Sequence, residues 1–462
     1  MRTRWLPVLV LLGATAVATV VGFPRSGPDT PAPGVMAAAR PSAPLLGIVS
    51  GKSRRDLVRV DPDTLRPKRG MRIDVGAEGC ARKGGGTACW GVPPWSFSAD
   101  RSLLAVALND GGVARSLRLV DVGRMRVATE VPLDGGAVGL VALPDRGRVL
   151  AVQQVCCAGA QQLLVVDLAR RRVAARRALG GAVLRAGRTP LELVLLLAPV
   201  GRIGPARLGI VDRRGAVRFV ELARSPAGMQ DGARTSHEVQ QRMPGLAIDA
   251  AGRRAFVVTP GLVAVVDLAR LAVSYHEPAR ASSALAWLRD WLDPAAYAKG
   301  ASGPTRVARW VGDGLLAITG ADEQLLTNAR GGTQVRVMAA GLSLVDTRDW
   351  SVRTIVDGAT DVRVADGLML ATGSSSHSSN GDADAIGLAA YDRHGDRRFR
   401  LFGGRQAWVT QVYAGRAYVG IAGQGGDAPL RVVDLAAGRS AGVRTQRLPW
   451  LLLDAASSWW DG

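Results

Sequence analysis

The cysteines are the residues of this sequence whose chemistry is easiest to recognise. Cys80 and Cys89 lie nine positions apart in the glycine-rich stretch GAEGCARKGGGTACW, and Cys156 and Cys157 are neighbours in VCCAGA. Four thiolates can hold Zn²⁺, but no CxxC spacing is present and adjacent cysteines chelate a metal poorly. In an oxidising compartment such thiols form disulfides. We expect either a Cys80–Cys89 bond with an eight-membered Cys156–Cys157 ring, or two bonds between the two pairs.

The other chemistry-bearing residues form no recognisable catalytic set. The four histidines have no HxH, HxxxH or HExxH spacing, and the sequence lacks GxSxG, Walker and dinucleotide-binding motifs. In SSSHSSNGDADAIG, Asn380, Asp382 and Asp384 alternate as oxygen ligands of Ca²⁺ do, but no bidentate Glu follows. We therefore expect no cofactor and no metal beyond this calcium candidate, and a binding protein is favoured over an enzyme.

The N-terminal residues predict export. Residues 1–23, MRTRWLPVLVLLGATAVATVVGF, combine two arginines, an apolar run and the small-residue motif Ala16-Val17-Ala18, which is typical of a signal peptide. The apolar run is also near the length that spans a bilayer, so an uncleaved N-terminal anchor is the alternative. Residues 24–44 are rich in Pro and Ala and predict an extended linker to a domain over 45–462.

The formal net charge is +20, which raises the question of a polyanionic partner. The basic residues are scattered along the chain instead of clustered, and nearly all are Arg, as a GC-rich genome favours. An affinity for anionic wall polymers or lipid headgroups is the alternative. We expect no nucleic-acid partner, because the chain is predicted to be exported and shows no clustered basic patch.

One short pattern recurs through the rest of the chain: a few strand-forming residues followed by Asp and a polar turn. The eight copies end at Asp61, Asp121, Asp167, Asp212, Asp267, Asp346, Asp392 and Asp434. Their spacing fits a unit of about 42–46 residues with insertions, the period of a β-propeller blade of four strands. We interpret the repeated Asp as a turn anchor, because its side chain accepts hydrogen bonds from the backbone amides that follow.

The chain ends predict how the ring closes. The first unit has no innermost strand, whereas LPWLLLDA near the C-terminus is an apolar strand left without a blade. Pairing the two chain ends removes the exposed edges of an open ring. The sequence therefore predicts an all-β propeller of eight blades, with seven as the alternative, closed by its C-terminal strand.

These units resemble the YVTN-type and related secreted β-propeller repeats. LVVD and IVD match the family's VVD-like strand, and LPDRGRVLAV, IDAAGRRAFVV and AGRAYVGI match its PDG-like hairpin, over residues 45–454. The name-giving tetrapeptide and the paired Trp-Asp of the tryptophan–aspartate (WD40) repeats are absent. The resemblance implies a WD40-like propeller fold and, by itself, little about function.

The long connections are predicted to lie on one face of the ring. In a four-stranded blade, the connections between second and third strands and from one blade to the next share a face, and the others share the opposite face. All the long segments belong to the first set: 76–93, 154–161, 199–206, 223–244, 276–305, 320–340 and 372–385. The largest, 276–305, predicts a short helix with Trp287 and Trp291 on one side, either a cap on the ring or a binding surface.

We expect an exported, non-catalytic propeller that binds an envelope protein, a glycan or a small ligand through this elaborated face. The alternatives are a propeller hydrolase, lactonase-like or glycan-cleaving, with carboxylates at the central channel, and a purely structural envelope protein. We further expect a secreted or extracytoplasmic monomer that contacts the membrane only through an uncleaved N-terminus.

Overall fold

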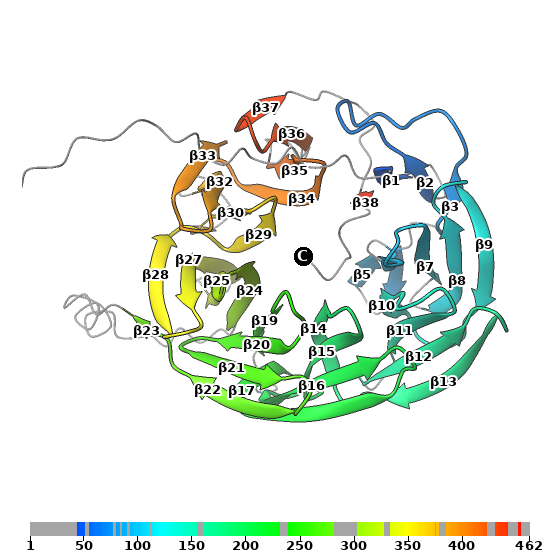
Figure 1. Cartoon of the computed structure of the whole chain (residues 1–462), viewed down its shortest axis with the longest axis horizontal. Coiled ribbons are helices and arrows are strands. Elements are labelled where there is room, and N and C mark those ends of the chain that lie inside the picture. Colours follow the sequence, from blue (N-terminus) through cyan, green and yellow to red (C-terminus); the bar gives the residue numbers. More distant parts are fainter. Residues whose placement is uncertain are drawn as a thin grey trace, which may run out of the picture. The chain divides into compact units, whose positions relative to one another are not determined.

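The computed structural model describes residues 44–50, 55–76, 80–83, 86–89, 93–110, 113–154, 160–231, 239–280, 303–327, 333–374, 376–377, 385–422, 430–441 and 451–453. All of them belong to one compact unit, residues 40–462. Within these ranges every regular element is a β-strand. Eight sheets, each built on four antiparallel strands, form an eight-bladed β-propeller (Figure 1), which confirms the predicted fold and excludes the seven-bladed alternative.

The four strands of each blade follow one another from the centre of the ring outwards. Blade 1 contains β38 (Leu451–Leu453), β1 (Leu46–Ser50), β2 (Arg55–Arg59) and β3 (Ile73–Asp74). Blade 2 contains β6 (Trp95–Phe97), β7 (Leu103–Asp110), β8 (Val113–Asp121) and β9 (Arg126–Pro132). Blade 3 contains β10 (Val138–Ala142), β11 (Arg148–Gln154), β12 (Gln161–Asp167) and β13 (Arg172–Ala178). Blade 4 contains β14 (Ala182–Arg188), β15 (Glu192–Ala198), β16 (Gly204–Asp212) and β17 (Val217–Asp231).

The remaining blades follow the same order. Blade 5 contains β19 (Gly245–Ile248), β20 (Arg254–Thr259), β21 (Leu262–Asp267) and β22 (Ala272–His276). Blade 6 contains β24 (Pro304–Gly312), β25 (Leu315–Thr327), β27 (Leu342–Asp346) and β28 (Ser351–Val356). Blade 7 contains β29 (Asp361–Ala365), β30 (Leu368–Gly373), β32 (Gly387–Asp392) and β33 (Arg397–Leu401). Blade 8 contains β34 (Ala407–Tyr413), β35 (Arg416–Ile421), β36 (Leu430–Asp434) and β37 (Arg439–Ala441).

Six further strands extend these blades or lie between them. They are β4 (Cys80–Lys83), β5 (Gly86–Cys89), β18 (Val239–Arg242), β23 (Ala279–Arg280), β26 (Thr333–Ala339) and β31 (Ser376–His377).

The C-terminal strand closes the ring as predicted. β38 pairs antiparallel with β1, with Leu46 opposite Leu453 and Ile48 opposite Leu451. The seam between blades 8 and 1 is also held by side chains, since the Tyr418 hydroxyl donates to the Pro62 carbonyl at 3.1 Å. Both ends of the chain therefore contribute strands to the same sheet.

Each blade is buried on both faces. Eight clusters of buried side chains lie one at each junction between neighbouring blades. Alternate residues of a strand point to opposite sides of a sheet, so Leu164 and Val166 of β12 pack toward blade 2 whereas Leu163 and Val165 pack toward blade 4. This arrangement explains why the middle strands are apolar at consecutive positions.

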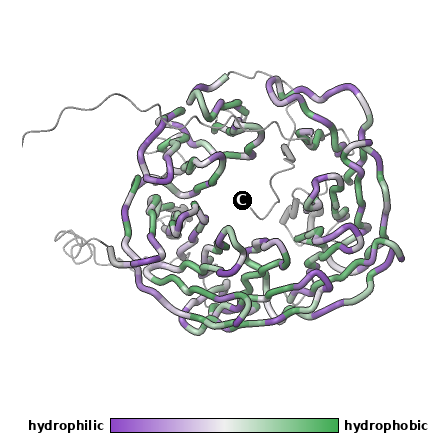
Figure 2. The backbone as a smooth tube through the Cα atoms, in the orientation of Figure 1, coloured by the Kyte–Doolittle hydropathy of each residue, from purple (hydrophilic) through white to green (hydrophobic). Residues whose placement is uncertain are grey.

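The outermost strands are more polar than the strands that they cover. Along β9 and β13 most side chains are exposed, and Val131 of β9 is the one buried side chain of the two strands. Figure 2 agrees, with hydrophilic stretches along much of the outer edge.

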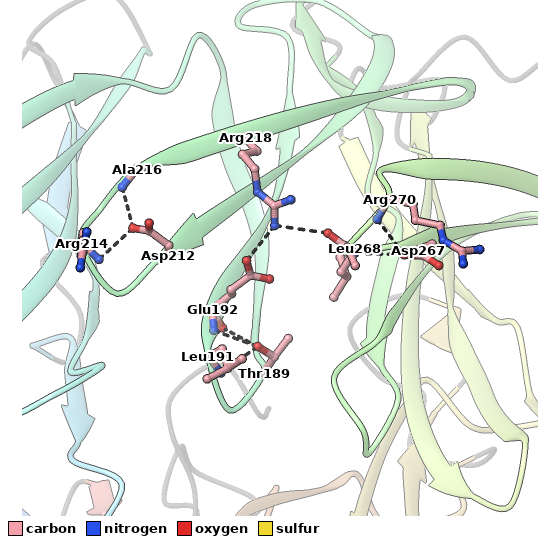
Figure 3. A network of polar contacts seen from close by, with 11 residues as sticks. Thr189, Leu191, Glu192, Asp212, Arg214, Ala216, Arg218, Asp267, Leu268 and Arg270 are labelled. Atoms are coloured by element: carbon pink, nitrogen blue, oxygen red, sulfur yellow. Dashed lines mark hydrogen bonds and ion pairs between the residues drawn. The ribbon is translucent and has the colours of Figure 1, made fainter.

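The repeated Asp is a turn anchor, as the sequence predicts. In all eight blades its carboxylate accepts at least one hydrogen bond from a backbone amide of the turn between third and fourth strands. Asp212, for example, accepts from the Arg214 and Ala216 amides, each at 2.8 Å (Figure 3). At Asp346, hydrogen bonds from the side chain of Arg348 and, to a smaller extent, from its backbone amide lower the pKa of the carboxyl to about 2.

These anchored turns have two backbone conformations, which the sequence pattern did not distinguish. In six blades the fourth residue after Asp is left-handed, with φ between 49° and 63°; these residues are Leu65, Met125, Arg171, Leu271, Trp350 and Gly438. In blades 4 and 7 the third residue after Asp, Gly215 or Gly395, has φ of 80° and donates its amide to the Asp carbonyl at 2.9 Å.

The tight turn of blade 4 generates a stability prediction. Gly215 faces blade 3 so closely that an added Cβ would overlap Cγ2 of Val165. Gly215→Ala should therefore lower the free energy of unfolding by about 2–4 kcal/mol, because it adds both left-handed strain and overpacking. Gly367, also left-handed with φ of 75°, has nothing within 4 Å of its Cβ position. Gly367→Ala should lower the free energy of unfolding by about 1–2 kcal/mol, from left-handed strain alone.

Urea unfolding monitored by tryptophan fluorescence compares the two variants with the parent chain. Equal midpoints for Gly215→Ala and Gly367→Ala would contradict the packing of the blade 4 turn against blade 3.

Candidate functional site

The two faces of the ring differ in their connections. On one face, here called the turn face, lie the connections from first to second and from third to fourth strands, which are two to five residues long in blades 2–8. One segment departs from the prediction that all of these are short: residues 60–72 join β2 to β3 in blade 1. All other connections longer than five residues join strand ends on the opposite face, here called the loop-bearing face.

Two of the long connections that the sequence placed on this face contain extensions of blade strands. β17 continues beyond blade 4 and pairs with β18, with Gly228 opposite Arg242. β25 continues beyond blade 6 and pairs with β26, and β26 also pairs with β31, which lies between β30 and β32 along the chain. The loop-bearing face therefore carries ordered β-ribbons, which can hold a binding surface in a fixed place.

A first cavity, of about 200 Å³, lies at the base of the β17–β18 ribbon. Arg224 and Arg242 supply its charge, and Met243 and Pro304 are among its apolar residues. Arg224 is paired with Glu277 at 2.6 Å. Its charge is therefore partly neutralised before any ligand binds.

A second and larger cavity, of about 360 Å³, lies against the first strands of four consecutive blades, β10, β14, β19 and β24. Figure 1 shows these strands on the inner side of the ring. Arg185 of β14 and Arg309 of β24 are the charged residues of its lining, and much of the rest is apolar, including Leu140, Val152 and Leu246. We call this space the channel cavity.

The first strands are rich in arginine and poor in carboxylates. Their basic residues are Arg185, Arg188, Arg306, Arg309 and Arg363, and Asp361 is the one acidic residue of the described first strands. Backbone carbonyls or a carboxylate already satisfy some of these arginines. Arg188 donates to the Phe97 and Leu143 carbonyls, and Arg306 pairs with Asp322 at 2.8 Å.

Arg185 has a different environment from Arg188 and Arg306. In the described part of the chain its guanidinium donates to the Leu184 carbonyl at 3.2 Å and forms no ion pair. Burial lowers the pKa of Arg185, and the negative charge of Asp361 acts in the opposite direction. The channel cavity therefore contains a partly desolvated positive charge.

Two of the sequence-predicted site residues, Cys80 and Cys89, lie within the described structure. Cys80 and Cys89 lie directly opposite one another in the two-stranded sheet of β4 and β5. The other predicted residues lie outside the described ranges and keep the status of predictions: Cys156, Cys157, Trp287, Trp291, Asn380, Asp382 and Asp384. The expected helix within 276–305 falls there as well; the described part of that segment includes β23, which runs parallel to β28.

The channel arginines, Arg185 and Arg309, were not among the site residues predicted from the sequence. A usable signal was present, because AVLRAGR and PTRVARWV place arginines inside strands that are otherwise apolar. Neither segment contains a motif, and the two strands are far apart in the chain, so only the fold brings Arg185 and Arg309 to one cavity.

Within the described ranges, no group of three or more His, Cys, Asp or Glu residues is placed to hold a metal ion. Among the same residues, no helix has the length and hydropathy needed to cross a membrane.

Comparison with known proteins supports the fold. No protein-family model and no curated protein matches the sequence. Among solved structures, the chain is similar to dihydro-heme d1 dehydrogenase NirN in complex with DHE, with a TM-score of 0.51 and 16% identity over 91% of this chain and 77% of that one. At this identity the likeness shows a shared propeller fold and nothing of activity.

Two weaker similarities carry no further argument. The WD40 domain of Toxoplasma gondii coronin has a TM-score of 0.40 and 11% identity, over 90% of this chain and 91% of that one. A prolyl endopeptidase has a TM-score of 0.43 and 13% identity, over 87% and 49%.

The register of β4 and β5 predicts which disulfide forms. Directly opposed residues of an antiparallel pair have Cα atoms about 4.5–5.5 Å apart, which lies within the span of about 4.4–6.8 Å that a disulfide bridges. We therefore predict a Cys80–Cys89 bond in protein made in an oxidising compartment. Non-reducing peptide mapping should recover that linked pair. A peptide joining Cys80 or Cys89 to Cys156 or Cys157 would contradict the prediction.

Proposed function

We propose that this protein is an exported, non-catalytic β-propeller that binds a ligand or an envelope partner on its loop-bearing face. The observation that carries the proposal is the asymmetry of the two faces. The turn face consists mainly of short turns anchored by Asp, whereas the loop-bearing face carries the long connections, the two β-ribbons and the 200 Å³ cavity beside one of them. Binding residues commonly lie on loops that a rigid scaffold holds in place.

The charges of the first strands also favour binding over hydrolysis in the channel. Glycoside hydrolysis uses two carboxylates flanking the scissile bond. The described first strands offer five arginines and a single carboxylate, Asp361. This set suits the binding of an anion better than acid–base catalysis.

Export, a disulfide and kinship with YVTN-type propellers belong to the same proposal. Export is supported by residues 1–23, kinship by the repeated strand–Asp units, and the disulfide by the opposed Cys80 and Cys89. A secreted or surface-held monomer with an envelope protein, a glycan or a small ligand as partner is consistent with these features.

Affinity capture from envelope extracts tests which face binds. The loop-face variant, Arg224→Glu with Arg242→Glu, reverses two exposed charges beside the 200 Å³ cavity. Its matched control, Arg124→Glu with Arg170→Glu, reverses two exposed charges on the turn face. We expect the loop-face variant to lose at least about tenfold of the specifically captured protein or glycan, because charge reversal at an interface is costly.

Quantitative mass spectrometry of the captured material provides the measurement. The control variant should retain the partners of the parent chain. Loss confined to the turn-face variant, or equal capture by all three proteins, would contradict the proposal.

A further inference from the structure

The channel cavity combines the size and the lining of a small-molecule site. Its volume of about 360 Å³ lies within the range of about 300–1,000 Å³ that ligand pockets commonly have. Such pockets are mostly apolar and contain a few placed polar groups that fix the orientation of the ligand. Here the apolar part includes Leu140, Val152 and Leu246, and the charged part consists of Arg185 and Arg309.

Two β-bulges lie in the strand segments that line this cavity. The first strands of blades 3 and 4 each contain a β-bulge, between Val138 and Leu140 and between Val183 and Arg185. The bulged residues, Gly139 and Leu184, both line the cavity. Bulges re-aim neighbouring side chains and occur often beside functional sites. Similar register shifts occur in the first strands of blades 6 and 8, but in blades 3 and 4 the bulged residues form part of the cavity wall.

The positive charge of Arg185 favours the binding of an anion in the cavity. Arg188 and Arg306 of the same inner strands are satisfied by backbone carbonyls and by Asp322. Arg185 is half-buried and has no ion pair in the described part of the chain. Partial burial of a charge that is not paired at contact distance costs free energy. The negative charge of Asp361 offsets part of that cost, and an anionic group in the cavity would offset more of it. A guanidinium can bind a carboxylate, sulfonate or phosphate through two parallel hydrogen bonds.

We propose that the channel cavity binds a small organic anion: one acidic group held by Arg185 and Arg309, and an apolar body packed on Leu140, Val152 and Leu246. Gln161 is the first residue of β12 and Val152 lies two residues before the end of β11, so one side of the cavity lies at the loop-bearing ends of these strands. The ligand therefore enters from that face, and in this respect the inference rests on the proposed function. Binding is non-covalent and requires no co-reactant.

The probe for this site is 8-anilinonaphthalene-1-sulfonate, which joins an apolar body to one anionic group. N-phenyl-1-naphthylamine has the same aromatic body without the sulfonate and is the uncharged control. We expect saturable binding of one sulfonate probe per chain by fluorescence titration, and weaker binding of the uncharged control. Arg185→Gln and Arg309→Gln should each weaken binding of the sulfonate at least about tenfold.

The variants have matched controls. Arg172→Gln removes an equal charge from an exposed position of β13 and should leave binding unchanged. Arg185→Lys keeps the charge but loses the bidentate fork, and its binding should fall between those of the parent and Arg185→Gln. If Arg185→Gln does not fold, displacement of the probe from the parent chain decides: naphthalene-1-sulfonate should displace it and naphthalene should not.

Three results would overturn the inference: equal binding by the parent, Arg185→Gln and Arg309→Gln; tighter or equal binding of the uncharged control; or no saturable binding of the sulfonate. Any of these, with capture by the loop-bearing face intact, rejects the anion site and leaves the proposed function standing. If capture no longer depends on the loop-bearing face but the probe still binds, the proposed function is rejected and the anion site stands.

Discussion

The structure depends on one constraint: every blade is a sheet with two apolar faces, and both must be covered. Alternate residues of the middle strands pack toward the preceding and the following blade, giving eight buried clusters at eight junctions. A fully buried Leu or Val contributes about 1.5–3 kcal/mol relative to an exposed one. The junction between blades 8 and 1, for example, buries Val58, Leu65 and Tyr418. The free-energy cost of leaving such a junction open is thus larger than the contribution of several hydrogen bonds, at about 1 kcal/mol each. The blades must therefore form a closed ring.

Ring closure explains why the two faces of the molecule differ. The junctions extend to the turn face, where short turns such as that of Gly215 pack against the neighbouring blade. Arg218 also reaches across a junction there, pairing with Glu192 at 2.7 Å and donating to the Leu268 carbonyl of blade 5 (Figure 3). Few insertions fit between such contacts. The loop-bearing face is where the chain can lengthen without opening a junction, and the ring holds the channel arginines in place beneath it.

Much of the architecture could be predicted from the sequence, because it repeats. Eight strand–Asp units gave the blade number, and the unpaired strand at LPWLLLDA gave the closure. The Asp-Gly pairs that begin at Asp313 and Asp366 are typical of two-residue hairpin turns, and both residues of each pair are left-handed, as such a turn requires. What could not be predicted depends on proximity between distant segments. Nothing in the sequence near Arg185 specifies that Arg309 lines the same cavity, and the polar composition of 223–244 concealed the ribbon that β17 forms with β18.

The closure of the ring by the C-terminal strand is most directly tested by two truncations. A chain ending at residue 453 keeps β38, whereas a chain ending at residue 441 lacks it and leaves β1 with an unpaired edge. Thermal unfolding and light scattering should show that the longer chain behaves like the full-length protein, while the shorter one unfolds at a lower temperature and associates. Identical unfolding temperatures and a monomeric state for both truncated chains would contradict a ring held shut by pairing of its two ends.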